Sequence, residues 1–255
     1  MSNQPNLGAG IGTAHGLQRR SAIATLATAG IVGPVLFVLV VIVQSLLHLD
    51  YSQVELPISA LATWPGGWVQ SVNFVVFGLL MIAYAIGLRL GVRPSRAGVI
   101  GPALLVLSGV GLIVAGFFPW RENDGDFVVP VGHLLGALLS FLGAGTGLIV
   151  VSRRMAADPR WRGVATYALA SGIVIVVLLV TTFALVVPPD APLYSWGGLV
   201  QQVTLAVWFP CTVILALRLL RLARARGAAL SDHFSSLTLA LALIHPSAWK
   251  ESSRK

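Results

Sequence analysis

Six long apolar stretches without a single Asp, Glu, Lys or Arg residue limit this chain more than any other feature. They cover residues 21–47, 68–88, 97–118, 131–151, 164–187 and 198–217. Each reaches the roughly 20 residues that a helix needs to cross about 30 Å of hydrocarbon. Only 10% of the residues are charged, too few to cover the surface of a soluble core this apolar. The sequence therefore predicts an all-α, multi-pass membrane protein, a bundle of six transmembrane helices.

The six stretches fall in one domain, residues 19–226, between two polar tails. Residues 1–18 show no apolar periodicity, so we expect a disordered tail. We also expect residues 227–255 to be disordered, because their apolar segment 237–244 is too short to span a membrane. The first stretch exceeds the roughly 7–15 apolar residues of a cleaved signal peptide, which indicates a retained helix.

The distribution of arginine predicts the orientation. Thirteen Arg residues lie in segments 19–20, 89–96, 153–162 and 218–226, whereas the alternate loops contain only Arg121. Because basic residues favour the cytoplasmic side, we expect both termini in the cytoplasm and a location in the cell membrane. Six of the nine carboxylates would then face outside, and they are Asp50, Glu55, Glu122, Asp124, Asp126 and Asp190.

The net charge of +8 is interpreted through this distribution and not as a sign of nucleic-acid binding. Arg218, Arg221 and Arg224 recur every three residues, so a helix through them would place all three near one face. We expect contact there with anionic lipids, in addition to ordinary anchoring by positive charge. Membrane lipids are thus the predicted partners.

Amide and imidazole side chains within or at the ends of the stretches gather near the predicted outer side. They are Gln44, His48, Gln70, Asn73, His133, Gln201 and Gln202. One interpretation is an outward-facing polar vestibule that binds a lipid headgroup or small polar ligand through Gln44, His48, Asn73, His133, Gln201 and Gln202. The alternative is that polar groups near the interface are tolerated because water reaches them.

His133 is the one candidate for catalysis, since it follows an acidic loop that carries Glu122, Asp124 and Asp126. Its imidazole, together with loop carboxylates or His48, could hold a divalent cation or act as a general base on water. Alternatively, His133 caps the start of its own helix or pairs with a loop carboxylate. No metal-binding spacing is present, and the single Cys211 excludes an intrachain disulfide, so we predict neither metal nor cofactor.

Small residues at intervals of four, Gly132, Gly136, Ser140 and Ala144, predict close packing of the fourth stretch, most simply against the third. We expect the fourth helix to be the most buried of the six. The same small-residue faces could instead join two copies of the chain or dock another protein.

Several short motifs occur in a recognisable order. Ile58 to Leu61 reads Ile-Ser-Ala-Leu, residues 116–119 read Gly-Phe-Phe-Pro before the acidic loop, and residues 198–201 read Gly-Leu-Val-Gln. Over about residues 22–222 the chain resembles the six-helix bacterial membrane family catalogued as domain of unknown function 998. The resemblance implies the six-helix fold and supplies no catalytic residue.

Three function classes remain open from the sequence. The first, which we favour, is a membrane protein without enzymatic activity that binds a ligand in the vestibule. The second is an intramembrane enzyme that uses His133 and the loop carboxylates on a lipid, with a metal or water. The third is a structural or assembly partner of another membrane protein.

Overall fold

The computed structural model describes residues 7–124, 126–188 and 190–244, and the side chains within residues 16–225 of these ranges. It contains six long helices, α1 (Leu7–Leu47), α2 (Trp68–Gly91), α3 (Arg96–Phe117), α4 (Val131–Ala156), α5 (Ala165–Leu185) and α6 (Gly197–Ile244). All six are long and apolar enough to cross a membrane. The predicted multi-pass helical membrane protein is thus confirmed.

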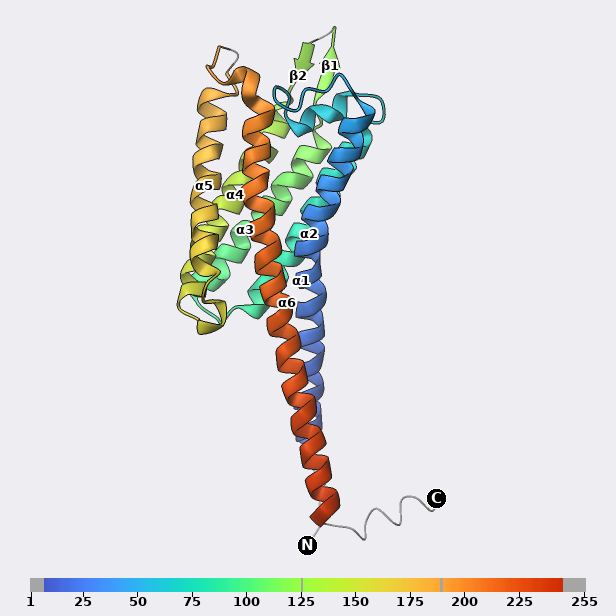
Figure 1. Cartoon of the computed structure of the whole chain (residues 1–255), viewed down its shortest axis with the longest axis vertical. Helices are drawn as coiled ribbons and strands as arrows, with labels where there is room; N and C mark the ends of the chain where they lie inside the picture. Colours follow the sequence, from blue (N-terminus) through green and yellow to red (C-terminus); the bar gives the residue numbers. More distant parts are fainter. Residues whose placement is uncertain (1–6, 125, 189, 245–255) are drawn as a thin grey trace.

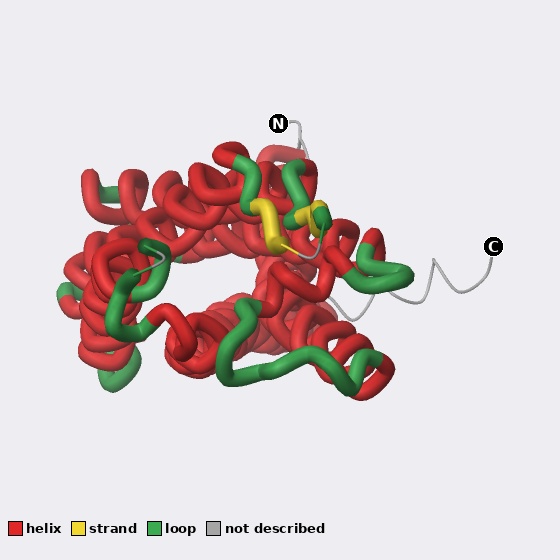
Figure 2. The backbone as a smooth tube through the Cα atoms, turned by 90° about the horizontal axis from the view of Figure 1, so that it is seen from above, coloured by secondary structure: helices red, strands yellow, loops and turns green. Residues whose placement is uncertain are grey.

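The helices form a closed ring in chain order, with α6 returning to pack against α1 (Figures 1 and 2). One end of the ring, here called the hairpin end, carries the loop 48–67 with the 3-10 turn η1 (Ile58–Thr63), strands β1 (Arg121–Asn123) and β2 (Asp126–Val128), and the turn η3 (Tyr194–Trp196). The opposite end, the arginine end, carries the α2–α3 turn and the α4–α5 loop with the turn η2 (Pro159–Trp161).

Helices α1 and α6 extend far beyond the other four at the arginine end (Figure 1). We expected disorder over residues 1–18 and 227–255 and helix bounds of 21–47 and 198–217. The structure instead starts α1 at Leu7 and continues α6 to Ile244, while residues 1–6 and 245–255 lie outside the described ranges. No proline occurs between residues 7 and 33 or between 211 and 244, and Leu, Ala and Arg in the second segment are good helix formers. Helix propensity therefore supports the extension of α6, whereas the extension of α1 includes four glycines and is not explained by propensity.

The expected acidic loop is a short β-hairpin. Strands β1 and β2 pair antiparallel, with Arg121 opposite Val128 and Asn123 opposite Asp126. Asp124 occupies the turn with φ of 52°, a left-handed conformation that Asp and Asn tolerate better than most residues. All six strand residues are exposed, so the hairpin projects its carboxylates away from the bundle.

Glycines bring α3 and α4 into close contact, which confirms that these helices are neighbours. A Cβ atom on Gly136 would lie 2.6 Å from the backbone nitrogen of Ala115, so no larger residue fits there without moving a helix. The fourth span is nevertheless only 44% buried, whereas the second and sixth spans are each 50% buried. The expectation that the fourth helix is the most buried was wrong, because α4 packs against α3 and α5 and leaves its remaining surface outside the ring.

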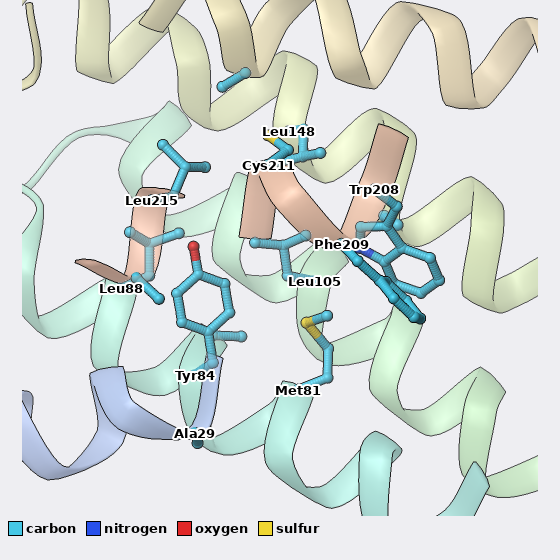
Figure 3. Close-up of a cluster of buried hydrophobic side chains, with 14 of the residues drawn as sticks. Ala29, Met81, Tyr84, Leu88, Leu105, Leu148, Trp208, Phe209, Cys211 and Leu215 are labelled. Carbon is cyan, nitrogen blue, oxygen red and sulfur yellow. The ribbon is translucent and has the colours of Figure 1, made fainter. Parts of the chain in front are cut away.

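Large apolar side chains fill the centre of the ring. Trp208, Phe77 and Tyr84 are almost fully buried, and α6 contributes Trp208, Phe209, Cys211 and Leu215 to the cluster in Figure 3. This core separates the polar residues of the hairpin end from the arginine end.

Candidate functional site: a lipid-facing groove and an enclosed cavity

Three of the polar residues at the hairpin end form a buried amide cluster between α1 and α2. Gln44 donates from Nε2 to Oε1 of Gln70 over 2.8 Å, and Asn73 donates from Nδ2 to the same oxygen over 3.3 Å. Asn73 also donates to the carbonyl of Phe37 over 3.2 Å, within the apolar part of α1. The three side chains are at most 5% exposed. They therefore join two helices and do not line an open vestibule.

Two adjacent glutamines at the start of α6 hold the loop 48–67 through hydrogen bonds. Gln201 accepts a hydrogen bond from the backbone nitrogen of Ile58 over 2.6 Å, and Gln202 donates from Nε2 to the carbonyl of Gln53 over 2.8 Å. Backbone nitrogens of Gly198 and Leu199 add bonds to the same loop, to the carbonyls of residues 55 and 54. The loop is consequently held against α6 by neutral groups.

His133 is buried and bonds to the end of the preceding helix. Its Nδ1 lies 3.1 Å from the carbonyl oxygens of both Ala115 and Phe118. Because carbonyls only accept, Nδ1 carries the proton and Nε2 is left as an acceptor. His133 thus caps the end of α3, and not the start of α4 as one interpretation expected. The rings of Phe74 and Trp120 lie edge-on to the imidazole, with centroids 6.1 and 6.2 Å away.

The loop carboxylates do not join His133. Glu122, Asp124 and Asp126 are exposed on the hairpin, and the described residues contain no ion pair between His133 and a carboxylate. Within those ranges no group of three His, Cys, Asp or Glu side chains is placed to hold a metal ion. His48 lies elsewhere, with its ring centroid 6.1 Å from that of Trp64. The predicted site residues therefore occupy several places instead of one acidic centre.

A groove of about 380 Å³ runs between α1 and α6 at the hairpin end. Its walls are mainly apolar, with four polar residues among them, and the lining comprises Phe37, Val38, Val41, Ile42, Ser45, Leu46, Tyr51, Gln53, Ile58, Gln202, Leu205, Ala206, Phe209 and Pro210. Tyr51 donates its hydroxyl to the carbonyl of Leu56 over 3.0 Å. Burial raises the pKa of the Tyr51 hydroxyl above its usual value, so this group is neutral.

A second, enclosed cavity of about 30 Å³ lies deeper in the ring. His133, Ser140 and Gln201 line it together with aromatic and aliphatic side chains. The groove and the cavity share four lining residues, Phe37, Ile58, Leu205 and Phe209, which form an apolar wall between them. The structure thus places His133 and Gln201 at one cavity and Gln202 in the groove.

Sequence reasoning missed a buried carboxylate at the arginine end. Asp158 is 1% exposed, accepts Nη2 of Arg160 at 2.6 Å and lies 3.6 Å from Nε of Arg93. The Arg160 side chain, as the main cause, lowers the pKa of Asp158 from 3.8 to about 2. Arg218 donates to the carbonyl of Arg160 over 2.7 Å, so α6 joins the same cluster. The sequence did contain one indication of this cluster, since Asp158 is the one carboxylate among four arginines in segment 153–162.

Comparisons with known proteins identify the family to which this chain belongs. No curated protein and no solved structure matched the chain. Residues 31–219, most of the chain and nearly all of the six-helix ring, match the family described as Protein of unknown function (DUF998). With that match and six membrane-spanning helices, the chain belongs to this family of multi-pass membrane proteins.

Proposed function

We propose that the protein binds a membrane lipid in the groove between α1 and α6. The observation that carries the proposal is the order of side chains along the groove. Tyr51, Gln53 and Gln202 lie at the hairpin end of the groove. Further into the membrane the walls are apolar, with Val38 on α1 and Pro210 on α6. An amphipathic molecule has the same order, with a polar end near the interface and acyl chains below it.

The groove also has the access that a lipid needs. Val38, Ile42 and Leu46 are 41%, 49% and 70% exposed on the outer face of the ring, where hydrocarbon surrounds a membrane helix. A lipid can therefore enter sideways without passing through the apolar core. The volume of about 380 Å³ falls within the roughly 300–1,000 Å³ of ordinary ligand sites.

The arginine distribution supports one orientation of this site. With thirteen Arg residues near the arginine end and Arg121 alone at the hairpin end, the positive-inside rule puts the hairpin end outside and both termini in the cytoplasm. In a cell membrane the groove would then open to the outer leaflet. The lipid headgroup would meet Gln53 and Gln202, which are neutral, so the proposal does not require a charged headgroup.

Native mass spectrometry of protein extracted from its own membrane tests the proposal. We expect wild-type protein to retain a lipid, and Ala206→Phe to lose it because the larger side chain fills the groove. Val177→Phe is the matched control, since Val177 is 57% exposed on the outer face of α5 and outside the groove. Absence of lipid from wild-type protein, or equal retention by both variants, would contradict lipid binding in this groove.

A further inference from the structure

The enclosed cavity behind the groove contains polar atoms that the protein itself does not satisfy. Ser140 is 2% exposed and Trp208 is 1% exposed, and both line the cavity. Neither Oγ of Ser140 nor Nε1 of Trp208 has a hydrogen-bond partner among the described residues. His133 also lines the cavity, and its Nε2 is an acceptor because both hydrogen bonds of this ring within the described residues use Nδ1.

Two buried, unpaired atoms on residues that line one cavity, with the acceptor Nε2 of His133 on a third, require an explanation. A buried donor or acceptor that loses its water without gaining a partner destabilises the folded state, so such atoms are rare in proteins. The remaining lining is aromatic and aliphatic apart from Gln201, whose Oε1 already accepts from the backbone nitrogen of Ile58. The three atoms are complementary in type, since Trp208 can only donate, His133 Nε2 accepts and the Ser140 hydroxyl does either.

The size of the cavity defines the occupant. A water molecule needs about 10–15 Å³ of cavity volume and at least two polar partners. The cavity provides about 30 Å³, which is room for two waters and too little for a lipid chain. The wall of Phe37, Ile58, Leu205 and Phe209 separates it from the groove.

We propose that this cavity is a water-binding site in which up to two ordered waters bond to Nε2 of His133, Oγ of Ser140 and Nε1 of Trp208. Gln201 lines the hairpin-end side, with Oε1 engaged by the backbone of Ile58. The site thus keeps water inside the apolar core, next to the groove. It does not depend on lipid binding, because the waters are held by a cavity that the groove ligand does not enter.

Ser108 provides a matched comparison for Ser140. Its side chain is fully buried on α3, its Oγ also has no partner among the described residues, and it lines neither the cavity nor the groove. Replacement of either serine by alanine changes helix propensity in the same direction and removes one hydroxyl. The two variants therefore differ in whether that hydroxyl reaches the cavity.

The test measures the melting temperature of Ser140→Ala and Ser108→Ala in the full chain. If waters bond to Ser140, the Ser140→Ala variant melts about 2–4 °C below the Ser108→Ala variant. Ser108→Ala melts at or above the wild-type temperature, because an unpaired hydroxyl is removed. Equal melting of the two variants, or a higher value for Ser140→Ala, would overturn the proposal. A structure at a resolution that shows waters gives the direct check, and an unfilled cavity there would also overturn it.

Discussion

The two ends of the bundle are fastened by different chemistry. At the hairpin end, neutral amides make the contacts: Gln201 and Gln202 hold the loop 48–67, and the buried cluster around Gln70 joins α1 to α2. At the arginine end, the buried carboxylate of Asp158 holds the side chains of Arg160 and Arg93 from two different loops. One end therefore depends on uncharged hydrogen bonds and the other on a charge cluster.

The difference shows that the acidic loop, where carboxylates are most concentrated in the sequence, is not where a carboxylate holds the fold together. The hairpin carboxylates Glu122, Asp124 and Asp126 are exposed, whereas Asp158, the one carboxylate in segment 153–162, is buried. Arg218, expected to contact anionic lipid, donates to a backbone carbonyl, while Arg221 and Arg224 remain exposed. Lipid contact at Arg221 and Arg224 stays a prediction, and Arg218 has a structural partner already.

Removal of the Asp158 carboxylate should produce the largest effect. Asp158→Ala leaves Arg160 without its partner and also removes the cap that accepts from the Arg160 backbone nitrogen. We expect a loss of about 3 kcal/mol in the free energy of unfolding, measured by denaturation in detergent. Asp126→Ala on the exposed hairpin is the control, with an expected change within about 0.5 kcal/mol. Equal effects of the two variants would erase the contrast between the ends.

Acid should weaken the arginine end selectively. The pKa of Asp158 falls from 3.8 to about 2 on folding, so the folded state binds the proton less tightly than the unfolded state does. The stabilisation is thus fully present above about pH 4 and is lost as the pH falls to about 2, and its size is about 2 kcal/mol. We expect the stability difference between wild type and Asp158→Asn to shrink over this interval. A difference that is constant from pH 5 to pH 2 would contradict the assignment.

The buried amide cluster should give a smaller effect at the hairpin end. Gln70→Leu removes the oxygen that accepts from both Gln44 and Asn73, so we expect a loss of about 2 kcal/mol in unfolding free energy. The double variant with Gln44→Leu should recover part of that loss, because it also removes the stranded donor. The four chains of this cycle are compared by thermal unfolding. If the losses in the two single variants add up to the loss in the double variant, the two amides do not interact.

The smallest change is expected at the loop 48–67. Gln202→Ala removes one hydrogen bond, to the carbonyl of Gln53, on a partly exposed surface. We expect a loss of about 1 kcal/mol and faster amide hydrogen exchange confined to the loop. Exchange that rises at the arginine end instead would show that the ends are not independent.

The sequence predicted the spans well because apolar length is a strong local signal. Four of the six stretches lie within the helices found, and the other two exceed α3 by one residue and α5 by three residues. The third and fourth helices pack through Gly111 and Gly136 as small residues indicate. The extensions of α1 and α6 were missed because the expected bounds followed apolarity, whereas both helices continue beyond their apolar parts. The hairpin was missed because strands of three residues are too short to show an alternating pattern.

The end of the bundle at which the amide and imidazole side chains lie could be predicted, whereas their hydrogen-bond partners could not. Polar residues were expected near one end, and Gln70 and Asn73 do share a face of α2. Which backbone carbonyl a side chain meets depends on tertiary contacts, so the bonds from His133 to Ala115 and Phe118 could not be inferred. The groove likewise requires α1 and α6 to be neighbours, although they are the ends of the ring in sequence.

The orientation of the two ends is the central claim, since it decides which leaflet the groove faces. Asp124→Cys and Arg162→Cys place exposed thiols at the hairpin end and the arginine end, in a chain whose buried Cys211 is replaced by alanine. Intact cells are then treated with a maleimide that cannot cross the membrane. We expect labelling at position 124 without permeabilisation and at position 162 only after it. Labelling of position 162 and not position 124 on intact cells would contradict the account.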